Sequence, residues 1–137
     1  MSDVTVTWVE KQQYVGVDSS KHSIVMSAQN DENKTGSKPS DLLLLALGGC
    51  AGVDLIEILQ KQRQKVAGLQ MHISGEQNAD PPWAFTKIHM EVVVRGRGLS
   101  ASSVERAIDL AVNKYCSVAA TIRAAAPITT SFRLVEE

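Results

Sequence analysis

The sequence predicts a single α+β domain that spans all 137 residues. Three observations support this class. Segments in which apolar and polar residues alternate, as they do in strands, lie at the start, in the middle and at the end of the chain. Stretches with helical character separate these segments, and neither a repeat nor a long linker divides the chain. The expected order of elements is therefore βββαββααβ, with mostly antiparallel sheets.

The N-terminal third predicts a three-stranded meander. Val4, Val6 and Trp8 alternate with threonines, and a similar two-residue rhythm returns at residues 14–18 and 22–26. The segment that follows, QNDENKTGS, is polar and rich in turn-forming residues, so we expect a loop before the first helix.

The first helix is expected to open at residues 38–41 and to run to about Gln64. A proline suits the first turn, and Asp41 suits the positive end of the helix dipole. The run Leu42 to Val53 is apolar on every side, yet it holds only about a dozen residues, whereas a membrane-spanning helix needs about 20. The pattern therefore indicates a buried core helix and no membrane partner.

Burial on all sides is more than one small sheet can provide, so we expect a homodimer in which the long helices pack centrally between two sheets. Gly48 and Gly49 lie in the middle of this helix, where each glycine costs about 1 kcal/mol of helix propensity. Either the close approach of another backbone or access for a small ligand would explain them. They are our candidate substrate pocket.

The second half of the chain predicts a hairpin and then two helical stretches. Alternation around residues 69–74 and 88–94, on either side of a Pro-Pro turn, indicates two paired strands. Ser102 and Glu105 form a capping-box pattern, which places the start of a second helix near residue 102. Its periodicity weakens at Asn113-Lys114.

The segment SVAATIRAAA reads as a further helical stretch that stops before Pro127, because the residue before a proline disfavours helix. Ile128, Thr130, Phe132 and Leu134 then alternate with other residues and predict a last strand.

The composition argues against several classes of partner. Fourteen basic and fifteen acidic residues give a formal charge of -1, and no segment concentrates Lys and Arg as a nucleic-acid-binding face would. The three histidines share no metal-binding spacing with each other or with the cysteines, so we expect no metal site. The N-terminus has no secretory pattern, which favours the cytoplasm, where thiols stay reduced.

The only two cysteines, Cys50 and Cys116, are the best indication of function. A thiolate can attack a peroxide oxygen, and a second thiol can trap the resulting sulfenic acid as a disulfide. Alternatively, each cysteine is simply a small buried apolar residue. If Cys116 lies in the first turn of the helical stretch beginning at Ser117, the helix N-terminus would lower its pKa.

Asp54 and Glu57 follow Cys50 on the same helical face and are possible supporting residues, together with Asp41. Carboxylates near a thiol disfavour its thiolate unless a cation is also present. A second interpretation is that these acids pair with a basic residue across a dimer interface.

Two blocks, KPSDLLLLALGGCAGVDLIEIL and KYCSVAATI, resemble the OsmC/Ohr family of thiol-dependent peroxidases, most closely its YhfA-like branch. The likeness extends from WVE near the start to the closing strand. It implies a swapped α+β homodimer in which Cys50 is the peroxidatic thiol and Cys116 the resolving one. It also implies a small organic hydroperoxide as substrate, an external thiol as reductant, and no cofactor.

The chain departs from that family pattern at one point. Well-studied members have an arginine in an N-terminal strand and a glutamate directly after the helix-opening proline, where this chain has Ser40, and no arginine precedes Arg63. Asp41 with another cation is one candidate replacement. Two alternatives to peroxidase activity follow: a non-catalytic dimer that binds a small apolar ligand, and a thiol redox sensor without turnover.

Overall fold

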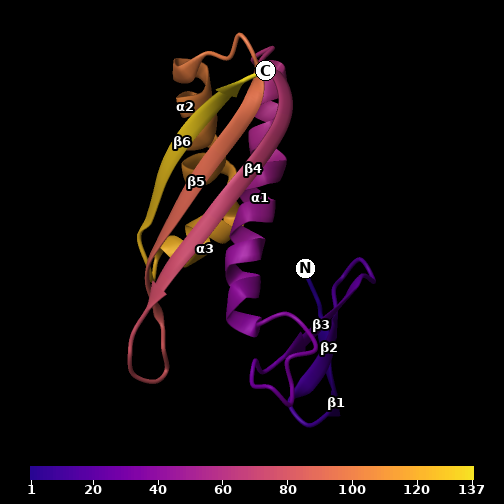
Figure 1. Cartoon of the computed structure of the whole chain (residues 1–137). Helices are drawn as coiled ribbons and strands as arrows, with labels where there is room; N and C mark the ends of the chain where they lie inside the picture. The colour runs from indigo at the N-terminus through magenta and orange to yellow at the C-terminus, as the bar shows by residue number, and fades with distance from the viewer. The chain divides into compact units, whose positions relative to one another are not determined.

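The computed structural model describes residues 1–137, and the chain divides into two compact units, Met1–Leu43 and Leu44–Glu137. Its elements follow the order βββαββααβ, with a π-helical turn inserted between the second and third helices (Figure 1). The predicted α+β class and element order are therefore confirmed.

The N-terminal unit is an antiparallel meander of β1 (Thr5–Glu10), β2 (Gln13–Val17) and β3 (Ser23–Ser27), as predicted. Every residue of β1 is exposed in the single chain, including the apolar side chains of Val6 and Trp8. A small sheet with open faces buries little apolar surface, so hydrogen bonds contribute much of the order in this unit.

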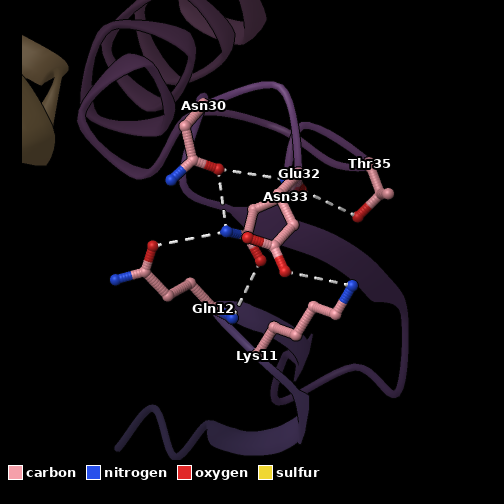
Figure 2. A network of polar contacts seen from close by, with 6 residues as sticks. All are labelled: Lys11, Gln12, Asn30, Glu32, Asn33 and Thr35. Carbon is pink, nitrogen blue, oxygen red and sulfur yellow. Dashed lines mark hydrogen bonds and ion pairs between the residues drawn. The ribbon is translucent and has the colours of Figure 1, made fainter.

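Asn33 holds the loop that follows β3, and its buried side chain has several partners (Figure 2). Its Oδ1 atom accepts a hydrogen bond from the Gln12 N–H at 3.1 Å, and its Nδ2 atom donates to Asn30 Oδ1 at 2.8 Å. Nearby, Lys11 and Glu32 form a solvent-exposed ion pair at 3.3 Å. The polar loop predicted from the sequence thus has a defined fold, because a buried amide that loses its partners is costly.

Helix α1 (Pro39–Lys61) has one buried face. Leu47, Ala51, Leu55 and Leu59 are spaced four residues apart and are at most 1% exposed. The core of the single chain covers only this face, and the burial of the other faces, which we expect from a second chain, stays a prediction.

Another face of α1 exposes the side chains of Leu45 and Val53. By length and composition the helix is long and apolar enough to cross a membrane, with a mean hydropathy of 2.1 over 18 residues. This differs from the sequence-based expectation, which counted only the uncharged run before Asp54, whereas 18 residues of the helix remain apolar on average. Length and hydropathy are equally compatible with a core helix of a globular protein, and α1 packs its leucine-rich face into such a core.

In the C-terminal unit, β4 (Lys65–Gln77) and β5 (Phe85–Arg97) form the predicted hairpin, and both strands are longer than expected. Strand β6 (Ile128–Glu136) pairs with β5 in parallel, so this sheet is mixed rather than fully antiparallel. The reason is that the helical connection returns the chain to the same end of the sheet. Alternate residues of β5 enter the core: Ile88, Met90, Val92 and Val94.

Helix α2 (Ala101–Leu110) begins one residue before the predicted position. Its cap is Ser100, whose Oγ atom accepts a hydrogen bond from the Ser103 N–H at 3.3 Å, so the expected Ser102–Glu105 capping box is not the one used. The Ser100 side chain satisfies a donor that the first helical turn leaves free.

A π-helical turn, η1 (Ala111–Tyr115), follows α2 directly and contains the predicted irregularity at Asn113-Lys114. The Cys116 N–H donates to the Ala111 carbonyl at 3.0 Å, which is a bond across five residues instead of four. Helix α3 (Ser117–Arg123) begins immediately afterwards. The wider turn therefore sets where the chain enters α3.

We expect Asn33→Ala to lower the free energy of unfolding by about 1–3 kcal/mol, because it leaves buried partners without a hydrogen bond. Chemical denaturation followed by circular dichroism measures the change. Glu32→Ala is the control, since it removes only the neighbouring exposed ion pair, and such pairs contribute little. Equal loss of stability in the two variants would contradict the role assigned to Asn33.

Candidate active site

Two elements bring the cysteines into one cluster within the C-terminal unit. Cys50 lies on α1 and is half-buried, whereas Cys116 is the N-cap residue of α3 and is buried. Both thiols are free, and both belong to the same apolar cluster. The two thiols are neighbours, because each affects the pKa of the other.

The Cys50 thiol faces the polar start of α3. The N–H of Val118 is the main cause that lowers the pKa of Cys50, and the Cys116 thiol and both the hydroxyl and N–H of Ser117 act in the same direction. The Ser117 Oγ atom shares a hydrogen bond with the Cys50 sulfur at 3.8 Å. Partial burial opposes these effects, but hydrogen bonding to the charged form prevails, so the site favours a thiolate at Cys50.

The Cys116 thiol has the opposite character. Burial is the main cause that raises the pKa of Cys116, and the neighbouring Cys50 adds to the rise. The Cys116 sulfur does accept a hydrogen bond from the Ala119 N–H at 3.3 Å, as an N-cap residue would. The N–H groups of Ala119 and Val118 at the start of α3 do act to lower the pKa of Cys116, as expected, but burial and the neighbouring Cys50 outweigh them. At Cys50 the donors of α3 prevail over burial, so the net shift of the pKa is downward.

The position of Cys116 is fixed from both sides. On one side the π-helical turn η1 ends at Tyr115. On the other side Arg123, in the last turn of α3, reaches back and donates to the Val112 carbonyl at 2.9 Å and to Asn113 Oδ1 at 3.0 Å. The short helix is thus tied to the turn that precedes it.

The predicted supporting carboxylates do not form hydrogen bonds with either thiol. Glu57 pairs with Lys61 of the same helix at 3.0 Å, on an exposed surface, so its partner is a basic residue one turn away. Asp54 is half-buried, and Asp41 is exposed in the first turn of α1. Asp54 and Glu57 follow Cys50 by four and seven residues within α1, yet the hydrogen-bond donors to the Cys50 thiol come from the start of α3.

Gly48 and Gly49, two of the three glycines of α1, differ in their surroundings. A side-chain carbon at Gly48 would lie 2.5 Å from the Ile73 Cδ1 atom, so close approach of β4 explains this residue. A side-chain carbon at Gly49 would meet nothing within 4 Å, and Gly49 is exposed beside Cys50. Gly49 alone therefore has open space in front of it.

Ser117 and Val118 are site residues that the sequence analysis missed. They act on Cys50 from a distance of 67 residues or more along the chain, so no local spacing could reveal the contact. The available signal was the serine directly after Cys116 at the start of a helical stretch.

The chain is similar in sequence to known proteins over most of its length. A sequence model of the family described as OsmC-like protein matches residues 29–131. Protein YhfA of Escherichia coli strain K12 is 39% identical over 130 residues, which cover 95% of this chain and 96% of that protein.

Two solved structures extend the comparison. A hypothetical protein from Aquifex aeolicus VF5 has a TM-score of 0.89 at 25% identity, covering 100% of this chain and 98% of that one. The organic hydroperoxide resistance protein OhrB of Bacillus subtilis has a TM-score of 0.66 at 15% identity, covering 97% of this chain and 98% of that one, and so shares its fold.

We expect Cys50 to be alkylated by iodoacetamide faster than Cys116 near neutral pH. The pKa of Cys50 is lowered, so its thiolate persists to lower pH, whereas the raised pKa of Cys116 keeps that thiol protonated. Rates measured over a pH series by peptide mass spectrometry should give a lower midpoint for Cys50.

Ser117→Ala tests the origin of this difference, because it removes one hydrogen bond to the Cys50 sulfur. The midpoint for Cys50 should rise, while Ser103→Ala on α2 should leave it unchanged. A midpoint for Cys50 at or above that of Cys116 in the unmodified protein would refute the assignment of the thiolate.

Proposed function

This chain belongs to the OsmC-like protein family, and on that premise we propose that it is a thiol-dependent peroxidase that reduces small organic hydroperoxides. One observation supports the proposal above all: the Cys50 thiol, whose pKa is lowered, neighbours a second thiol, Cys116, whose raised pKa keeps it protonated. Peroxide reduction needs a nucleophilic thiolate and a nearby partner for its oxidised form.

In the first step the Cys50 thiolate attacks the terminal oxygen of the hydroperoxide. The O–O bond breaks, Cys50 becomes a sulfenic acid, and an alkoxide leaves. The protonated Cys116 thiol is a suitable donor of the proton that converts the alkoxide to an alcohol, because burial keeps this thiol neutral until that moment. The donors that stabilise the thiolate, at Ser117 and Val118, also suit a negative charge at the attacking centre.

In the second step the Cys116 thiolate attacks the sulfur of the sulfenic acid. An S–S bond forms, hydroxide leaves and takes a proton from solvent, and the protein holds a Cys50–Cys116 disulfide. An external dithiol then reduces this disulfide and is itself oxidised, which restores both thiols. No cofactor takes part in this cycle.

The activation of Cys50 in this proposal depends on hydrogen bonds rather than on the arginine and glutamate of the family pattern. The main causes of its lowered pKa are backbone and side-chain donors at the start of α3. These donors are neutral, so we expect the thiolate to be stabilised less than it would be beside a cation. Redox sensing without turnover is the alternative that this difference favours.

We further propose that the protein is a cytoplasmic homodimer that uses the exposed face of α1. Leu45, Gly49 and Val53 are spaced four residues apart on that face, where Leu45 is 62% and Val53 69% exposed in the single chain. A glycine between two apolar side chains permits close packing of a second helix. The apolar side chains exposed on β1 are a further reason to expect a partner.

With cumene hydroperoxide and a dithiol, we expect steady-state consumption of peroxide and an intramolecular Cys50–Cys116 disulfide after one equivalent of oxidant. Cys50→Ser should lower turnover more than about a hundredfold, because it removes the nucleophile. Cys116→Ser should instead trap a sulfenic acid or an intermolecular adduct, which mass spectrometry detects.

Each outcome separates the alternatives. A disulfide without dithiol-dependent turnover supports redox sensing, and unmodified thiols under excess peroxide support a non-catalytic ligand-binding protein. A Cys50→Ser protein that still consumes peroxide at the original rate would exclude the assigned roles.

For the homodimer, we expect sedimentation velocity to give twice the mass of the chain, and Val53→Asp to weaken association more than about tenfold. A carboxylate buried in an apolar interface without a partner is costly. Gln60→Asp introduces the same group at another exposed position of α1 and should leave the mass unchanged. A monomeric unmodified protein would contradict the dimer proposal.

A further inference from the structure

We propose that Arg63, Lys65 and Arg97 form a binding site for a phosphate group carried by a small soluble molecule or present as the free anion. These three side chains and Gly98 line a hollow of about 210 Å³ in the C-terminal unit. Arg63 lies in the connection between α1 and β4, Lys65 begins β4, and Arg97 ends β5. Three positively charged groups thus surround one small space.

The strand register places two of these charges directly against each other. Lys65 and Arg97 are cross-strand partners in the antiparallel pairing of β4 with β5. Side chains at directly opposed positions lie on the same face of the sheet, and like charges in such a pair destabilise it. A bound anion would offset the repulsion between Lys65 and Arg97. Without an anion, placing these two charges opposite each other does not stabilise the fold.

The third charge occupies an unusual backbone position. Arg63 has a φ of 59°, in the left-handed region, two residues after the end of α1. Glycine is the common residue at such a helix end, because a side chain there is strained. The helix dipole favours a cation at the C-terminal end of α1, which accounts for the positive charge of Arg63. It does not account for the opposed pair of Lys65 and Arg97.

No carboxylate neutralises the three groups. None of them takes part in any ion pair of the structure. The Glu136 carboxylate lies at the edge of the hollow, where its Oε1 atom accepts a hydrogen bond from the Gly98 N–H at 3.0 Å, but it forms no ion pair with any of the three basic groups. Arg95, the next basic residue on this face of β5, is already paired with Glu137 at 3.3 Å.

The chemistry of the three groups indicates the class of ligand. Two guanidinium groups offer paired donors that match two oxygens of a tetrahedral oxyanion, and a lysine adds a compact positive charge. The hollow has room for a phosphate group but not for a large organic molecule, so any remainder of a phosphorylated molecule would extend into solvent. Three charges are also too few for the extended backbone contacts of nucleic acid binding.

The site is separate from the thiols. Lys61, the last residue of α1, is eleven residues beyond Cys50, which corresponds to a rise of about 16 Å along the helix. Anion binding can therefore be present or absent independently of peroxidase activity.

The test is a titration of the intact protein with sodium phosphate and, in a second arm, with ADP, at constant ionic strength maintained with sodium chloride. Chemical shifts of backbone amides are followed by ¹H–¹⁵N NMR. We expect saturable changes at Arg63, Lys65 and Gly98, with about tenfold weaker binding in Arg97→Gln, because a charged donor pair is lost. Lys65→Gln should also weaken binding.

Arg106→Gln is the matched control, since it removes the same charge from an exposed position on α2. Equal affinity for phosphate and ADP would identify the free anion as sufficient, and tighter binding of ADP would identify a phosphorylated molecule as the better ligand. Either result supports the site. The proposal is overturned if the chemical-shift changes do not saturate up to about 10 mM phosphate or ADP. It is also overturned if Arg106→Gln weakens binding as much as Arg97→Gln does.

Discussion

The hydrogen bonds between the start of α3 and the Cys50 sulfur are the interaction on which the site depends. They join the middle of α1 to a helix that begins 67 residues later, and they lower the pKa of Cys50, whereas burial raises the pKa of Cys116 in the same apolar cluster. Without them Cys50 would be a partly buried thiol in apolar surroundings, where burial raises a pKa. With them, the same cluster contains one thiol suited to attack and one suited to remain protonated.

Much of the fold could be predicted from the sequence because its patterns are local. Alternation predicted the strands, and the break in periodicity at Asn113-Lys114 lies in the π-helical turn. The end of α1 was predicted three residues too late, because a left-handed Arg63 stops the helix without a glycine or proline to announce it. The parallel pairing of β6 could not be predicted, since it depends on how the connection crosses the sheet.

The site was predictable only in part. The two cysteines are rare residues, and their identity suggested the chemistry. Which of them ionises depends on burial and on donors from a distant segment. The sequence indicated that α3 acts on Cys116, but not that burial outweighs this effect or that α3 also acts on Cys50. Likewise, Arg63, Lys65 and Arg97 are scattered in the sequence and meet only through the hairpin register, so composition gave no sign of a basic cluster.

The π-helical turn before Cys116 has a geometric consequence for the thiol pair. It accommodates one residue more than a regular turn would between Ala111 and Cys116. Successive residues of an α-helix are rotated by about 100° around its axis, so an ordinary turn there would direct the sulfur of Cys116 to a different side. The direction in which the Cys116 side chain points toward Cys50 thus depends on the number of residues in this turn. A single inserted or deleted residue would change that direction while leaving every strand of the sheet in place.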